Sequence, residues 1–164
     1  MRSALTRQLK KEFEARLLQR MPSAKRVAMD DNLFGWLAWS VIPNERVGMY
    51  VTLIISPKAD QFTLELAWST NNRIPKHTGK WRDSDQGAEE LRFRISRLWQ
   101  MTGFEVWYDL QHEADFPDSG PPFSSSVPIE ECFSRIPIKV DRALDALEAY
   151  GVPYFSEISQ TWSG

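Results

Sequence analysis

Apolar residues in the first part of the chain follow the period of an α-helix. They recur at every fourth position: Leu5, Leu9, Phe13 and Leu17. This spacing places them on one face, with Leu18 and Met21 widening the apolar stripe. Ser3 is expected to cap the start, and Pro22 to end the helix, because the residue before a proline avoids the helical conformation. We therefore expect an amphipathic helix with one face in the core.

Three apolar segments then carry the signature of β-strands. Residues 33–42 are apolar at nearly every position, as in a central strand, and residues 47–56 are rich in β-branched side chains. Residues 62–69 alternate strictly between large apolar side chains and small or polar ones. The connections PNER and PKADQ are short and rich in turn-forming residues. Short turns between strands predict an antiparallel meander.

The second half of the chain has a weaker pattern. Residues 91–98 fit both a strand and a helix; their strict alternation favours a strand, and the helix stays open as an alternative. Phe104 begins a further strand-like segment, while residues 112–128 are rich in proline, glycine and serine and predict a loop. Residues 138–151 predict a helix that ends at Gly151, since Pro153 follows closely.

These elements indicate one α+β domain that spans residues 1–164. It consists of an N-terminal helix, an antiparallel meander of four to five strands, and a C-terminal helix packed on one face of the sheet. A chain of 164 residues with 42% hydrophobic residues is large enough to bury a substantial core. Seven tryptophans, nine phenylalanines and four tyrosines are expected to supply much of that core.

Charge is distributed unevenly along the chain. The formal net charge is −2, which gives no overall argument for nucleic-acid binding. Residues 1–26 nevertheless contain eight basic and two acidic side chains, whereas residues 104–164 contain three basic and eleven acidic ones. One interpretation is that the two regions face each other within the domain. The other is that the acidic region binds a basic partner.

The cysteine content and the hydropathy pattern indicate the cellular compartment. Cys132 is the single cysteine, so no disulfide forms within the chain, as expected in a reducing compartment. The basic N-terminus lacks the apolar segment of a signal peptide, and no apolar run approaches the length of a membrane span. We expect a cytoplasmic protein of bacterial type with no membrane contact.

The strongest local signal is the basic segment RIPKHTGKWR, from residue 73 to residue 82. Its candidate binding residues are Arg73, Lys76, His77, Lys80, Trp81 and Arg82. Cations beside an aromatic ring bind phosphates and stack on bases, and Trp and Arg also dominate protein interfaces. A third interpretation is an ordinary solvated loop whose tryptophan packs on the sheet. The sequence leaves these three open.

No catalytic or metal motif is complete. Gly79–Lys80 resembles the end of a phosphate-binding loop, but Ile74 and Trp81 occupy the positions that need glycine and Ser or Thr. One acidic segment offers metal-ligand residues without a calcium-loop spacing: Asp109, His112, Glu113, Asp115 and Asp118. Cys132 follows Glu130 and Glu131, which disfavour a reactive thiolate. We predict no metal site, cofactor or catalytic residue.

The leading functional hypothesis is therefore a small non-enzymatic protein-binding module. In type alone it is similar to immunity or adaptor proteins, with the acidic C-terminal region docking a basic protein such as a nuclease toxin. One alternative is a nucleic-acid-associated accessory protein that uses residues 73–82. Another is a small enzyme built from scattered residues, with Glu65, His77 and His112 as its acid–base groups. The oligomeric state is not predicted.

Overall fold

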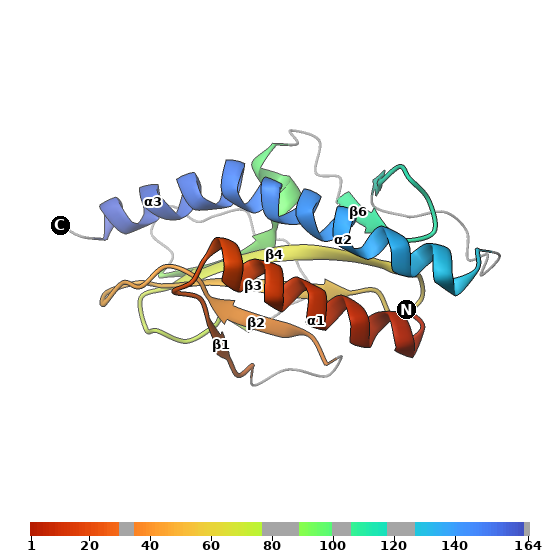
Figure 1. The fold of residues 1–164 in the computed structure, drawn as a ribbon. Coiled ribbons are helices and arrows are strands. Elements are labelled where there is room, and N and C mark those ends of the chain that lie inside the picture. The colour runs from red at the N-terminus through yellow and green to blue at the C-terminus, as the bar shows by residue number, and fades with distance from the viewer. Residues whose placement is uncertain (30–34, 77–88, 100–105, 118–126, 163–164) are drawn as a thin grey trace.

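The computed structural model describes residues 1–29, 35–76, 89–99, 106–117 and 127–162. It confirms an α+β fold in which helices cover one face of an antiparallel sheet (Figure 1). The helical elements are α1 (Ser3–Arg20), η1 (Ile95–Leu98), α2 (Ile129–Ala146), η2 (Leu147–Gly151) and α3 (Val152–Thr161). The strands are β1 (Lys25–Val27), β2 (Leu37–Ser40), β3 (Gly48–Ile55), β4 (Gln61–Ser69), β5 (Glu90–Arg94), β6 (Val106–Asp109) and β7 (Phe116–Pro117).

The sheet is built around β3 and β4. Its strand order is β1-β2-β3-β4-β6-β7, and every pairing is antiparallel. β5 and β6 both pair with β4, β5 along its C-terminal half and β6 at its start, where Gln61 lies opposite Asp109. The predicted meander corresponds to β2, β3 and β4. The very short strands β1 and β7 were not predicted, because three or two residues carry no detectable alternation.

The core lies between the sheet and the helices. The predicted stripe residues Leu5, Leu9, Phe13 and Leu17 are fully buried. Met21 is partly buried against the core, whereas Leu18 is 38% exposed and does not widen the stripe. From the sheet, alternate residues of β3 and β4 join this core: Met49, Val51, Leu53, Ile55, Phe62, Leu64, Leu66 and Trp68. α1 and α2 lie side by side over them (Figure 1).

Several predicted boundaries were wrong. Ser3 does not cap α1, because Arg2 occupies the cap position and no side chain caps the helix. Residues 91–98 combine both alternatives: β5 ends at Arg94 and a turn of 3₁₀-helix follows.

The C-terminal helix begins at Ile129, nine residues earlier than predicted, and contains Pro137. It does not end at Gly151, since the wider turn η2 leads directly into α3 and Pro153 lies in the first turn of that helix. None of the helices in the described part of the chain is both long and apolar enough to cross a membrane.

Candidate functional site

Two residues of the predicted basic loop lie in the described chain. Arg73 and Lys76 are both exposed. The backbone around them is tied to the sheet: Ser69 Oγ donates to the Arg73 carbonyl at 2.5 Å, and Arg92 Nη1 donates to the Pro75 carbonyl at 2.9 Å. The remaining candidates lie outside the described residues: His77, Lys80, Trp81 and Arg82. The binding role of residues 73–82 therefore stays a prediction.

The basic start and the acidic end of the chain meet between α1 and α2. Arg16 Nη1 lies 2.7 Å from an Asp141 carboxylate oxygen. Arg20 lies 3.0 Å from Asp141, 2.6 Å from Asp145 and 3.5 Å from Glu148. Within this part of the chain, the two regions of opposite charge face each other, as the first interpretation predicts. These acidic side chains already have cationic partners.

Three basic side chains of α1 are not neutralised by acidic neighbours in the described chain. Arg7, Lys10 and Lys11 form no ion pair with any residue in the described ranges. We use the name α1 stripe for five exposed positions spaced three or four residues apart: Ala4, Arg7, Lys11, Ala15 and Leu18. Such positions fall on one face of a helix. The stripe combines two cations, two small residues and one exposed leucine.

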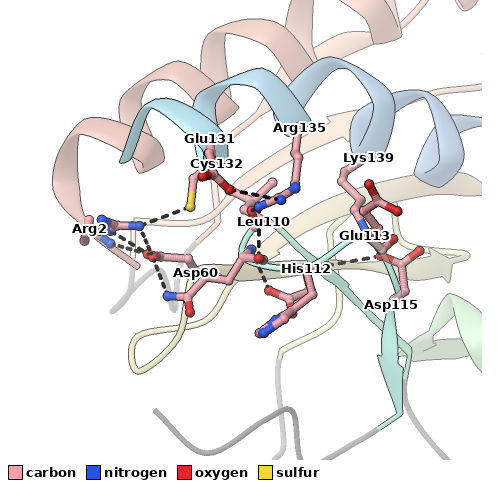
Figure 2. A network of polar contacts seen from close by, with 12 residues as sticks. Arg2, Asp60, Leu110, His112, Glu113, Asp115, Glu131, Cys132, Arg135 and Lys139 are labelled. Atoms are coloured by element: carbon pink, nitrogen blue, oxygen red, sulfur yellow. Dashed lines mark hydrogen bonds and ion pairs between the residues drawn. The ribbon is translucent and has the colours of Figure 1, made fainter. Parts of the chain in front are cut away.

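A polar network fixes the start of α1 to the sheet and to α2 (Figure 2). The backbone N–H and Nε of Arg2 donate to the two carboxylate oxygens of Asp60 at 2.9 and 2.8 Å. Gln111 Nε2 also donates to Asp60, at 3.0 Å. Burial acts to raise the pKa of the Asp60 carboxyl, but these hydrogen bonds outweigh it and hold the pKa below its usual range. The network therefore requires an ionised Asp60.

Cys132 belongs to the same network and is an unsuitable nucleophile. Its side chain is fully buried, and Arg2 Nη2 lies 3.1 Å from its sulfur. Burial raises the pKa of the thiol, against the opposing effect of Arg2. The sequence predicted an unreactive thiol because Glu130 and Glu131 are close in sequence. In the structure, burial is the main reason that the thiolate is disfavoured.

Acidic side chains at the end of β6 and in the segment after it are paired with basic side chains. Asp115 binds Lys139 Nζ and, at 3.3 Å, Arg142 Nη1. Asp109 is buried, and its carboxylate lies at a hydrogen-bonding distance of 2.6 Å from His112 Nδ1. Across the described ranges, no group of three or more His, Cys, Asp or Glu side chains gathers as metal ligands would. Asp118 lies outside those ranges.

The proposed acid–base groups do not converge. Asp109, which holds His112, lies opposite Gln61 at the start of β4, and Glu65 lies four residues further along that strand. At 3.4 Å per residue this separates them by roughly 14 Å along the sheet. Glu65 is instead bound by Arg92 Nε at 3.2 Å. His77 lies outside the described residues. Among the described residues, Glu65 and His112 therefore do not form an acid–base pair.

A polar, buried surface lies on the face of the sheet opposite the helices. We call it the polar face: Thr52 of β3, Gln61, Thr63 and Glu65 of β4, and Arg92 and Arg94 of β5. Thr52 and Arg94 lie directly opposite Glu65 on its two neighbouring strands. These side chains alternate with the apolar residues that face the helices. The alternation of residues 62–69 already placed Thr63 and Glu65 on one face of a strand, but grouping them with the others required knowledge of how the strands pair.

The polar face carries hydrogen-bonding atoms that have no partner within the described chain. Thr52 Oγ1, Thr63 Oγ1 and Gln61 Nε2 are buried and have no hydrogen-bond partner within the described chain. The exposed fractions of these residues are 0%, 0% and 5%. Such a group costs about 1–3 kcal/mol, and most buried polar groups in proteins are paired.

Comparisons with known proteins found no match: no family model, no curated protein and no solved structure is significantly similar to this chain.

Proposed function

We propose that this protein is a non-enzymatic binding module that docks an acidic partner protein through the α1 stripe. The observation that carries the proposal is the uneven compensation of charge between α1 and α2. Arg16 and Arg20 are paired with acidic residues of α2 and η2, whereas Arg7 and Lys11 form no ion pair with an acidic residue of the described chain. The uncompensated charge on this surface is positive, which favours an acidic partner.

The proposal reverses the sign of the partner expected from the sequence. That expectation placed a basic partner on the acidic C-terminal region. Asp141, Asp145 and Glu148 are acidic residues of that region that lie against α1, and all three already contact Arg20. A basic partner would have to compete with these internal contacts, whereas an acidic partner on the α1 stripe would not.

The shape of the α1 stripe suits a protein partner better than nucleic acid. Ala4 and Ala15 allow another backbone to approach closely, and Leu18, 38% exposed, supplies apolar contact area. Nucleic-acid binding depends mainly on many phosphate contacts, for which two cations and a net charge of −2 are a poor basis. These features favour protein recognition by an amphipathic helix face.

Charge reversal tests the proposal. Tagged wild type and the Arg7→Glu/Lys11→Glu variant are used to capture partners from the lysate of the native source at low salt. We expect a stoichiometric acidic protein with the wild type and at least about a tenfold loss with the variant, equivalent to about 1.4 kcal/mol. The matched control is Lys25→Glu/Lys58→Glu, because both lysines are exposed, lie outside α1 and change the net charge equally.

Two results would count against the proposal. One is capture that survives charge reversal of the α1 stripe, or that falls equally in the control. The other is captured material whose absorbance at 260 nm disappears after nuclease treatment, which would favour the nucleic-acid alternative.

A further inference from the structure

The outward face of α2 has the same spacing of exposed positions as the α1 stripe. We use the name α2 stripe for five exposed residues of this helix: Glu131, Ser134, Ile138, Arg142 and Asp145. In both stripes the positions lie three, four, four and three residues apart, so each stripe follows one face of its helix. Ile138 is 57% exposed, and Leu18 of the α1 stripe is 38% exposed. Each of the two exposed helix faces therefore contains a large apolar side chain.

The two helices lie side by side on the sheet and run in the same direction (Figure 1). Arg16 contacts Asp141, and Arg20, one turn further along α1, contacts Asp145, one turn further along α2. Both contacts join residues that are 125 positions apart in the sequence. A residue of α1 therefore lies at the same level along the helix axis as the residue of α2 whose number is higher by this offset.

The charges of the two helices are complementary in their first halves. Arg7 and Lys11 form no ion pair with any residue in the described ranges. At the start of α2, Glu130 is exposed and also forms no ion pair within those ranges. The side chain of Glu131 is 57% exposed and forms only a surface ion pair within α2. Such a pair is weak, so Glu131 remains able to bind a second cation.

We propose that the acidic partner of the α1 stripe is a second copy of this chain, bound through the start of α2. This inference rests on the proposed function. In a two-fold dimer whose axis runs parallel to the helices, α1 of each copy lies on α2 of the other, and every residue keeps its level along the axis. Arg7 of one copy then lies level with Cys132 of the other, the residue directly after Glu131.

The apolar positions of the stripes also match in this arrangement. By the same offset, Ile138 lies between the levels of Lys11 and Ala15 on the facing helix. Ala15 leaves room for the isoleucine side chain, since large and small residues at facing positions let two layers interdigitate. A two-fold axis perpendicular to the helices would instead lay α1 on α1 and keep Arg7 away from the acidic start of α2. Charge and packing therefore both favour the parallel arrangement, in which the contact between α1 and α2 is made twice.

The experiment measures the mass of the purified full chain by light scattering after gel filtration, at concentrations up to about 200 μM. We expect the wild type to approach twice the 19.0 kDa of one chain. Two variants, Arg7→Glu/Lys11→Glu and Glu130→Lys/Glu131→Lys, each place like charges at both contacts. Each should raise the Kd of the dimer at least about tenfold.

Each variant has a control that changes the net charge by the same amount. Lys25→Glu/Lys58→Glu matches the reversal on α1, and Glu45→Lys/Glu157→Lys matches the reversal on α2. These four residues are exposed and lie outside both stripes. We expect both controls to dimerise with the Kd of the wild type.

Mixing the two stripe variants tests whether the two sites touch each other. In an equimolar mixture, the acidic α1 of one variant faces the basic start of α2 of the other, and the remaining contact keeps the wild-type charges. We therefore expect a heterodimer, although each variant alone is monomeric. The quadruple variant, which carries both reversals in one chain, should dimerise by itself and gives the same test if one of the variants fails to fold.

Three results would overturn the inference. The first is a wild type that keeps the mass of one chain over the whole concentration range. The second is a dimer that survives both charge reversals, because another surface would then form it. The third is a mixture and a quadruple variant that both stay monomeric. In each case, capture of a different acidic protein from the lysate, lost on charge reversal of the α1 stripe, would leave the proposed function standing.

Discussion

At the scale of single residues, the buried polar groups fall into two classes: those with hydrogen-bond partners in the described chain and those without. Asp60 is 5% exposed and receives hydrogen bonds from Arg2 and Gln111, so its charge is well stabilised. Thr63 is equally buried and has no hydrogen-bond partner within the described chain. The sequence predicted neither outcome: Asp60 was interpreted only as part of a turn, because its partners come from positions 2 and 111. Long-range contacts of this kind leave no local pattern.

The lowered pKa of Asp60 makes the free energy of unfolding depend on pH. Its pKa is held below the usual value, so its contribution is fully present above about pH 4 and is lost as the pH falls through the lowered pKa. We expect Asp60→Asn to reduce the free energy of unfolding by about 1.5–3 kcal/mol at pH 7. The difference from wild type should shrink toward zero as the pH falls from about 4 to 2.

Urea unfolding at a series of pH values checks this expectation. Asp145→Asn is the control, since its side chain is 68% exposed and its loss should cost less than about 1 kcal/mol. A difference between wild type and Asp60→Asn that stays constant down to about pH 2 would contradict the proposed role of the Asp60 charge.

At the scale of elements, the sequence predicted the central residues of helices and strands better than the residues at which they begin and end. The apolar period placed α1 correctly, and the alternation of residues 62–69 identified β4 together with its two faces. Gly151 and Pro153 led to a wrong end for the C-terminal helix, because both are ordinary signals for the end of a helix. Tertiary packing overrides these signals: the chain stays helical from Ile129 to Thr161 through the turn η2. Propensity is weak beside the burial of a long apolar face.

Gly151 is explained by packing rather than by helix termination. A Cβ atom there would lie 2.7 Å from Leu147 Cδ1 and 3.4 Å from Leu66 Cδ1. Alanine favours a helix by about 1 kcal/mol over glycine, but overpacking a filled core costs about 1–3 kcal/mol. We expect Gly151→Ala to lower the free energy of unfolding by about 1 kcal/mol.

Chemical denaturation measures the effect of Gly151→Ala. Ala149→Gly in the same turn is the comparison, because Ala149 is exposed and reports helix propensity with little packing. Greater stability in Gly151→Ala would show that Leu147 and Leu66 move aside easily, and the packing explanation of this glycine would then be wrong.

At the scale of the whole molecule, the two faces of the sheet differ in chemistry. One face packs α1 and α2 into the core, and this arrangement follows from the sequence pattern. The other face buries Thr52, Gln61, Thr63 and Glu65 around two arginines. Polarity at alternate positions of a strand predicts exposure to water, so sequence alone could not show that these residues are buried. Their burial became visible only with the complete fold.

The buried hydroxyls of the polar face, which have no partner in the described chain, imply a cost in stability. The free energy of unfolding of Thr63→Val, measured in urea without added phosphate or carboxylate, tests this implication. We expect the variant to be about 1 kcal/mol more stable than wild type, because a buried hydroxyl with no partner in the described chain is replaced by a methyl group. A variant less stable than wild type would show that the Thr63 hydroxyl is satisfied within the protein, and would contradict this account of the polar face.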